Sequence, residues 1–160
     1  FNNKNINFDF NIKANKIYDN SNFANINLAA KIQEGLIDID NTKFSWKKYI
    51  DFKFQDSLIF VKNGHLTLDG KLKINILDYN ELYKFLLTPK NYRIKIKSVD
   101  LNFTYDFDQK SAEISDVRVD GKFNQNLNKI ISNINLKGDN LQNKIYLKKL
   151  INNAIKNYSG

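Results

Sequence analysis

The 160-residue sequence has no cysteine and no methionine, and only one histidine, one proline and one tryptophan. Without cysteine, the chain forms no disulfide and offers no thiolate nucleophile or cysteine-based zinc site. The lone histidine, His65, follows an Asn-Gly turn, so we interpret it as a surface residue at a hairpin edge. A translated chain starts with methionine, so we expect this sequence to be a segment of a longer protein. Any signal peptide or membrane anchor would then lie outside it.

Arginine is also scarce. The formal net charge is +8 and the sequence pI is about 9.5, yet only Arg93 and Arg118 among the 25 basic residues are arginines. Arginine is the better bidentate reader of phosphates and guanine. The lysines are scattered between apolar residues, as in the run from Lys71 to Lys73. We therefore interpret the lysines as part of a solvated strand face and predict no nucleic-acid partner. A β-domain that binds nucleic acid through its positive charge is kept as an alternative hypothesis.

Apolar residues make up 42% of the chain, and most of them recur at every second position. This alternation is typical of strands with one buried face. It runs through Ile6–Ile12, Ile26–Ile32, Leu36–Asp40, Ile50–Phe54, Leu66–Ile76, Ile94–Phe107 and Ala112–Val119. The phase slips at Ser98 and again in the last run, which predicts two bulges. Only Leu58–Val61 is continuously apolar, so we expect that stretch to be covered on both faces.

Short polar breaks separate the runs, among them Glu34-Gly35, Asn63-Gly64 and Asp120-Gly121. Asn-Gly favours a tight hairpin turn, and no helical crossovers separate the early strands. Asp78 is expected to cap a short helix over 79–87, which Pro89 ends. After Gly121 the period becomes helical, with candidates over 127–134 and 141–158.

The sequence therefore predicts a mainly β fold with a few helices. We expect an antiparallel meander that forms a strongly twisted or groove-like sheet. Residues 1–160 form one segment, in which residues 1–120 are mostly strands and residues 121–160 form a helical cap.

No catalytic pattern stands out. There is no Gly-x-Ser-x-Gly elbow, no phosphate-binding glycine loop and no Cys–His pair. Asp38-x-Asp40 resembles the start of a calcium loop. Such a loop needs glycine and glutamate at the positions that Lys43 and Tyr49 occupy here. We therefore interpret both carboxylates as part of an outward strand face. We predict a protein that is not an enzyme, with no catalytic residues, metal site or cofactor.

The aromatic residues fall within the apolar stripes, for example Phe8, Phe52 and Phe103. A sheet core is the simplest interpretation; an apolar face offered to acyl chains and a base-stacking surface are the alternatives. A single-layer meander has a whole apolar face to cover, and the expected helices cover only part of it. The rest must pack on another domain, close on itself or bind apolar ligands.

From Ile32 to Asp120 the sequence resembles the C-terminal region of the AsmA family of bacterial envelope proteins. The resemblance lies in three stretches of alternation with turn glycines: Gln33–Asp40, Asp56–Gly64 and Leu66–Ile74. The block from Asp78 to Arg93 shares it. These motifs carry no catalytic signature.

The resemblance implies a periplasmic segment at the inner membrane of a Gram-negative bacterium, anchored from outside this segment. It implies a role in outer-membrane biogenesis or intermembrane phospholipid transport, with phospholipid or another apolar ligand bound in a β-groove. The alternative is a structural or protein-interaction module whose apolar face is filled by its own helices or a partner. The candidate groove lining is Leu66, Leu68, Leu72, Ile74, Ile94, Ile96, Leu101 and Phe103. The amphipathic C-terminal helix departs from the family pattern, and it plugs the groove, caps the sheet or lies on a membrane.

Overall fold

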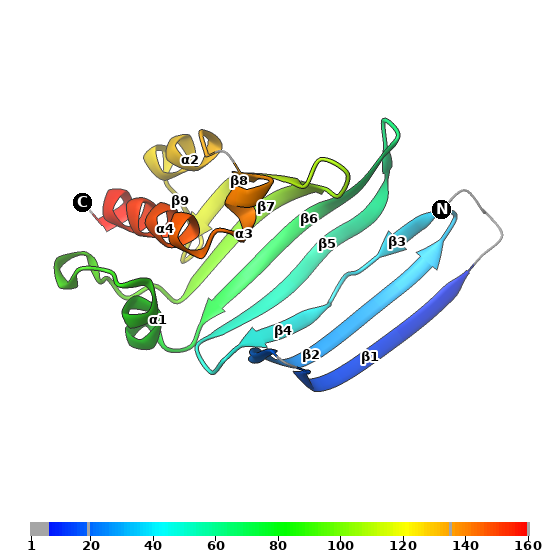
Figure 1. The fold of residues 1–160 in the computed structure, drawn as a ribbon, viewed down its shortest axis with the longest axis horizontal. Helices are drawn as coiled ribbons and strands as arrows, with labels where there is room; N and C mark the ends of the chain where they lie inside the picture. Colours follow the sequence, from blue (N-terminus) through cyan, green and yellow to red (C-terminus); the bar gives the residue numbers. More distant parts are fainter. Residues whose placement is uncertain (1–6, 19, 135, 160) are drawn as a thin grey trace.

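The fold is a twisted antiparallel sheet with its helices gathered over one face, at one end (Figure 1). The computed structural model describes residues 7–18, 20–134 and 136–159. Its ten strands and few helices confirm the predicted mainly β class. Ile6, predicted to begin the first strand, lies outside the described residues.

The strands are β1 (Phe8–Ile17), β2 (Asn20–Gln33), β3 (Leu36–Asp38), β4 (Lys43–Trp46), β5 (Ile50–Lys62), β6 (His65–Ile76), β7 (Ser98–Asp106), β8 (Ser111–Val119), β9 (Lys122–Phe123) and β10 (Leu136–Lys137). The helices are α1 (Tyr79–Leu86), the 3-10 turn η1 (Lys90–Tyr92), α2 (Gln125–Ser132), α3 (Asp139–Gln142) and α4 (Lys144–Ser159).

Neighbouring strands follow the order β1-β2-β3-β5-β6-β7-β8-β10, so the sheet is a meander. Strands β3 and β4 share one position, because both pair with β2 on one side and β5 on the other. The link between them is buried and polar. The Thr42 hydroxyl donates to the carbonyl of Ala29 at 2.9 Å, and the Ser57 amide donates to Asp40 Oδ1 at 2.6 Å. These bonds replace the strand-to-strand hydrogen bonds that are lost at the break between β3 and β4. The alternation in the sequence did not reveal this break.

Three predicted turns are confirmed, among them the tight hairpin turn expected at Asn63-Gly64. Glu34-Gly35, Asn63-Gly64 and Asp120-Gly121 each form a two-residue loop between paired strands. In all three, both residues have positive φ, from 49° to 84°. This is the pattern of a type I′ turn, whose twist matches that of the strands.

One face of the sheet is apolar from edge to edge. Directly paired residues of antiparallel strands lie on the same face. One such row runs Phe8, Ile32, Ile37, Ile59, Leu68, Tyr105, Ala112, Leu136. The polar partners of the alternation therefore share the opposite face.

Among the described residues, the strands contain bulges with positive φ at Asp56 in β5 and Asp116 in β8, and the register also shifts in β2 around Asn25, which has a φ of 50°. The β8 bulge confirms the slip predicted in the last run. The β5 bulge reverses the alternation, so that Ile59 and Val61 face the apolar side and Leu58 and Phe60 the polar side. Leu58 and Val61 are exposed, so the prediction of cover on both faces is wrong.

The slip predicted as a bulge at Ser98 is instead the beginning of β7. Residues 93–97 run outside any strand, and Asp120 Oδ1 accepts the amides of Lys97 and Ser98 at 2.8 Å each. A side-chain acceptor thus takes the place of a neighbouring strand at this point.

Helix α1 begins as predicted, with Asp78 accepting the Glu81 amide at 3.0 Å. The predicted helix over 141–158 is broken at Asn143. The Asn143 side chain accepts the amides of Ile145 and Tyr146, which makes it the N-cap of α4. Asp139 and Asn140, which directly precede the predicted helix, belong to the separate short helix α3.

The buried core is small and lies under the helices. One cluster joins Ile96, Val117 and Val119 to Leu127 of α2, and another joins Tyr83 and Leu86 of α1 to Ile155 of α4. The chain exposes 10661 Å², whereas a folded monomer of this mass exposes about 8,300 Å² by the usual scaling. Much of the sheet is therefore a single uncovered layer.

Candidate apolar binding groove

An apolar cavity of about 310 Å³ lies between the sheet and its helices. Its floor comes from β5 to β8, and its roof from α1, α2 and α4. The lining residues are all apolar or aromatic: Ile50, Phe52, Ile74, Ile76, Leu82, Tyr83, Leu86, Ile96, Val99, Leu101, Ile114, Val117, Val119, Leu127, Ile131, Ile134, Leu150, Ile151, Ala154, Ile155 and Tyr158. Its volume is at the lower end of the range for small-ligand pockets, about 300–1,000 Å³.

The cavity continues into an uncovered row of aromatic rings. Phe52 lines the cavity, and its ring stacks on Phe44 with centroids 4.8 Å apart. Phe44 in turn contacts Phe23 at 5.7 Å and Phe54 at 6.3 Å, and Phe54 lies 5.7 Å from Phe103. All five rings are half-buried. We call the cavity and this aromatic row together the groove.

Hydrogen bonds from a few buried polar side chains hold the helices of the roof in place. The Tyr83 hydroxyl donates to the carbonyl of Ile94 at 2.6 Å. Burial raises the pKa of the Tyr83 phenol above its ordinary value of 10.0, the bond to Ile94 opposes that shift, and the charge of Asp120 adds to it. The buried Thr88 hydroxyl donates to Asn152 Oδ1 at 2.6 Å, and Asn152 Nδ2 donates to the Leu86 carbonyl at 2.7 Å. These last two bonds tie the end of α1 to α4.

The structure brings three of the eight sequence-predicted lining residues to the cavity: Ile74, Ile96 and Leu101. Ile94 packs against the buried cluster around Val117, in the irregular segment before β7. Leu66, Leu68, Leu72 and Phe103 lie on the same face, outside the cavity. They extend the floor toward the open end.

The other cavity residues were not predicted as lining residues. Ile50, Phe52, Val117 and Val119 carried the same alternation and would have been found by including every strand. The roof residues, such as Leu127 and Ala154, lie on predicted helices. Which face of the sheet these helices cover, however, depends on tertiary contacts that periodicity does not encode.

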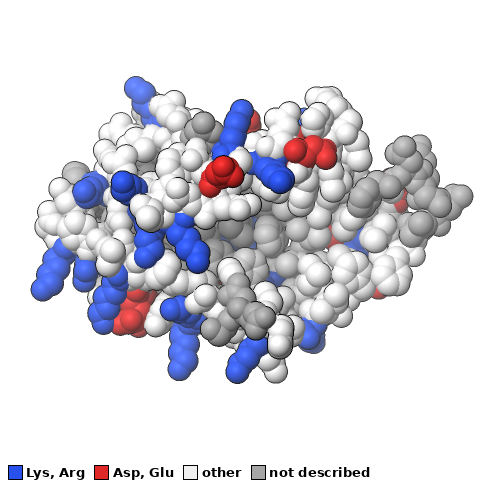
Figure 2. Space-filling model, viewed as in Figure 1, with Lys and Arg blue, Asp and Glu red and all other residues white. Residues whose placement is uncertain are grey.

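Lysines surround the helix-bearing end of the groove. Lys148 Nζ lies 3.9 Å from the Phe85 ring centroid, and Lys47 Nζ lies 5.4 Å from that of Trp46. The Trp46 and Phe85 rings contact each other at 4.5 Å. Figure 2 shows basic side chains projecting around this end and along the lower edge, and they outnumber the acidic ones on the visible face.

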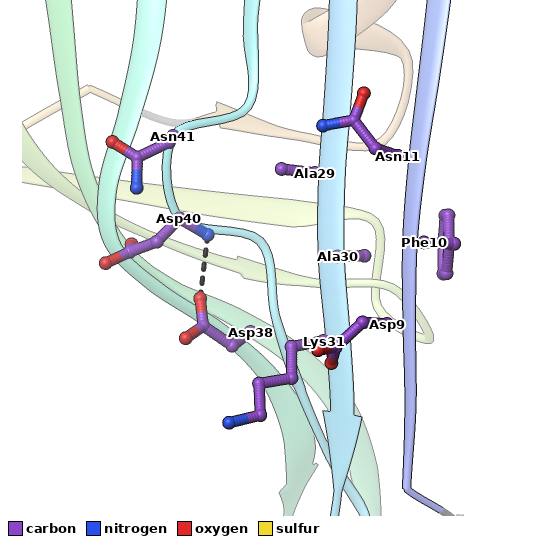
Figure 3. Close-up of a pocket in the computed structure, with 9 residues that line it drawn as sticks. All are labelled: Asp9, Phe10, Asn11, Ala29, Ala30, Lys31, Asp38, Asp40 and Asn41. Atoms are coloured by element: carbon purple, nitrogen blue, oxygen red, sulfur yellow. Dashed lines mark hydrogen bonds between the residues drawn. The ribbon is translucent and has the colours of Figure 1, made fainter.

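The polar face carries a separate, shallow pocket of about 400 Å³ over β1, β2 and the β3–β4 link (Figure 3). Asp38 Oδ1 accepts the Asp40 amide at 2.8 Å, and Asp40 Oδ1 accepts the Ser57 amide. Asp38 ends β3, in agreement with its interpretation as a strand residue. Asp40 lies in the turn after β3 and holds the backbone of β5 instead, so the strand interpretation is wrong for Asp40.

Among the described residues, no helix combines the length and apolarity needed to cross a membrane. A scan against protein-family models and searches of curated proteins and solved structures each find no match to this chain.

Proposed function

We propose that this chain is a lipid-binding, non-enzymatic segment of a bacterial cell-envelope protein, and that its groove takes the acyl chains of phospholipids. The observation that carries the proposal is the apolar cavity of about 310 Å³, which opens into the aromatic row at Phe52. A long apolar chain fits a site that is enclosed at one end and open at the other. Burial of each methylene contributes about 0.8 kcal/mol.

The lysines at the helix-bearing end support a phospholipid rather than a neutral apolar ligand. Lys47 and Lys148 lie over aromatic rings beside the covered part of the groove. Aromatic rings with an ammonium nearby suit the boundary between acyl chain and headgroup. An anionic phosphate there meets cations, while its acyl chain reaches the cavity.

The envelope setting rests on the resemblance of the alternating, glycine-turned stretches between Ile32 and Asp120 to the AsmA family. We therefore propose a place at the periplasmic face of the inner membrane and a role in outer-membrane biogenesis or phospholipid transport.

The second candidate is a structural or protein-interaction module. It is favoured by the fact that α1, α2 and α4 already cover one end of the apolar face. On that hypothesis the cavity is part of the core, and the open aromatic row is covered by a partner chain.

A cavity-filling variant separates these candidates. Ala154 of α4 lines the cavity, so Ala154→Phe places a ring in the space proposed for the acyl chain. The matched control is Asn153→Phe, which adds the same ring at an exposed position on the same helix. Each protein is expressed in bacteria, extracted with organic solvent and analysed for phospholipid by mass spectrometry. Binding of a fluorescent fatty acid is measured on the delipidated proteins.

We expect wild type and Asn153→Phe to carry phospholipid and bind the fatty acid, and Ala154→Phe to lose at least about tenfold in affinity, the equivalent of about 1.4 kcal/mol. If wild type carries no lipid and binds no fatty acid, the acyl-chain proposal is wrong. A more stable Ala154→Phe protein in that case supports the core interpretation, because filling an empty cavity stabilises a fold.

A further inference from the structure

The only imidazole of the chain faces two carboxylates on the polar side of the sheet, opposite the groove. His65 begins β6, Asp106 ends β7, and Asp108 lies in the turn between β7 and β8. The Nδ1 atom of His65 lies 3.5 Å from Asp106 Oδ2 and 3.7 Å from Asp108 Oδ2. All three atoms lie within 4.8 Å of one another. Among the described residues, this is the one cluster of histidine and carboxylate ligands with such spacing.

Backbone hydrogen bonds orient both carboxylates. Asp106 Oδ1 accepts the amide of Gln109 at 2.8 Å, which leaves Oδ2 turned toward the imidazole. Asp108 Oδ2 accepts the amide of Leu66 at 2.9 Å and retains a further lone pair. The cluster is therefore held by the hairpin tip and the neighbouring turn.

A second observation concerns the imidazole itself. His65 Nδ1 is shielded from solvent and has no hydrogen-bond partner, although the side chain as a whole is 40% exposed. A buried nitrogen without a partner is costly. Its distances to the two oxygens are longer than a normal hydrogen bond but leave space for an ion between the three atoms.

We propose that His65, Asp106 and Asp108 bind a divalent transition-metal ion, with Zn²⁺ as the best fit. Zinc bonds to nitrogen and carboxylate oxygen are about 2.0–2.2 Å long, so ligand atoms in a tetrahedral site lie roughly 3.4 Å apart. The observed 3.5 and 3.7 Å are close to this spacing. Calcium and magnesium prefer six or more oxygen ligands and have no need of an imidazole.

The fourth ligand position opens toward a polar pocket of about 380 Å³ beside the cluster, lined in part by Thr67, Thr104 and Glu113. Water completes the coordination there. The ion joins the tip of the β5–β6 hairpin to the β7–β8 turn, two loops that are distant in sequence. Metal binding therefore stabilises the folded protein by an amount that rises with the logarithm of the free metal concentration above the dissociation constant.

Zinc binding through an imidazole can be assigned to His65 without ambiguity, because the chain has one histidine and no cysteine. Tag-free protein treated with a chelator is titrated with ZnCl₂ by calorimetry, and the His65 ring signals are followed by NMR. We expect one zinc equivalent to bind and to shift the single set of imidazole signals, with no competition from Mg²⁺.

Three variants locate the site. His65→Gln and Asp106→Asn are expected to weaken zinc binding at least about tenfold. Asp38→Asn is the matched control, because it neutralises a carboxylate elsewhere on the polar face and keeps binding unchanged. Absence of zinc binding by wild type, or equal affinity in His65→Gln, overturns the proposal. Lipid binding in the groove is unaffected by either result.

Discussion

The two ends of the apolar face share one sequence pattern and differ in burial. At the covered end, Val117 and Leu127 are each 3% exposed, under or within the helices. At the open end, Phe8 and Ile12 of β1 are 55% and 52% exposed, although their alternation is equally regular. Alternation therefore marks which face is apolar, and the helices decide which part of that face becomes a core.

The comparison also separates two kinds of site. The covered end contains the apolar cavity, and buried polar groups beside it are hydrogen-bonded, as for the Tyr83 hydroxyl and the Ile94 carbonyl. The open end presents aromatic rings that pack against one another, such as Phe44 against Phe23. The two ends meet at Phe52, which lines the cavity and stacks on Phe44.

The largest expected effect tests the difference in burial directly. Leu127→Ala removes a leucine of α2 that is buried against Val117 and Val119, and we expect a loss of about 2–5 kcal/mol in the free energy of unfolding. Leu66→Ala makes the same change at a half-buried position near the open end, with an expected loss of about 1 kcal/mol. Urea unfolding measures both. Equal losses would contradict a core confined to the covered end.

A smaller effect is expected inside the sheet, at the bulge in β5. A β-carbon on Gly70 would lie 2.2 Å from Ser57 Oγ and 2.7 Å from Ser57 Cα. We therefore expect Gly70→Ala to cost about 1–3 kcal/mol, the usual range for overpacking. Thermal unfolding measures it.

The control combines Gly70→Ala with Ser57→Gly. The second change removes the Ser57 side chain but leaves its Cα, so it should recover part of the lost stability. If the two changes instead add their separate costs, close packing at this point is not the cause.

The smallest expected effect concerns the polar anchor of the covered end. Tyr83→Phe removes the bond to the Ile94 carbonyl and should cost about 0.5–1.5 kcal/mol. The matched control is Tyr18→Phe, at an exposed position, with no expected cost. Similar losses in both variants would show that burial of Tyr83 is not what makes its hydroxyl matter.

The stability difference between wild type and Tyr83→Phe also depends on pH. Because burial raises the pKa of the Tyr83 phenol, the folded protein favours its neutral form. Its contribution is complete below pH 10.0 and is lost as the pH rises through the folded-state pKa. The stability difference between wild type and Tyr83→Phe should shrink over that range.

Much of the fold was predictable, because strands and turns depend on neighbouring residues. Asn63-Gly64 predicts its hairpin, and Asp78 predicts the first turn of α1. Two of the exceptions involve a distant partner. Asp120 accepts the amides at the beginning of β7, and Asp40 and Thr42 satisfy the break between β3 and β4. Asn143, by contrast, breaks the last helix through a local cap that competes with a continuous helical period.

The groove was predictable only in part for the same reason. Ile74 and Leu101 were identified because they lie on a regular stripe, whereas Leu127 and Ala154 reach the cavity through the packing of α2 and α4 on the sheet. His65 gave no signal of a metal site, since Asp106 and Asp108 are distant in sequence and meet it only through the pairing of β6 with β7.

By itself, the sequence determined the strands, the turns between them, the apolar face and the lack of cysteine chemistry, because each depends on residue type and local spacing. The tertiary structure alone decided which end of that face is covered, where a cavity remains and which carboxylates surround the only histidine. The physical reason is that burial and ligand geometry depend on contacts between segments far apart in the chain. Periodicity, which repeats within a few residues, carries no information about such contacts.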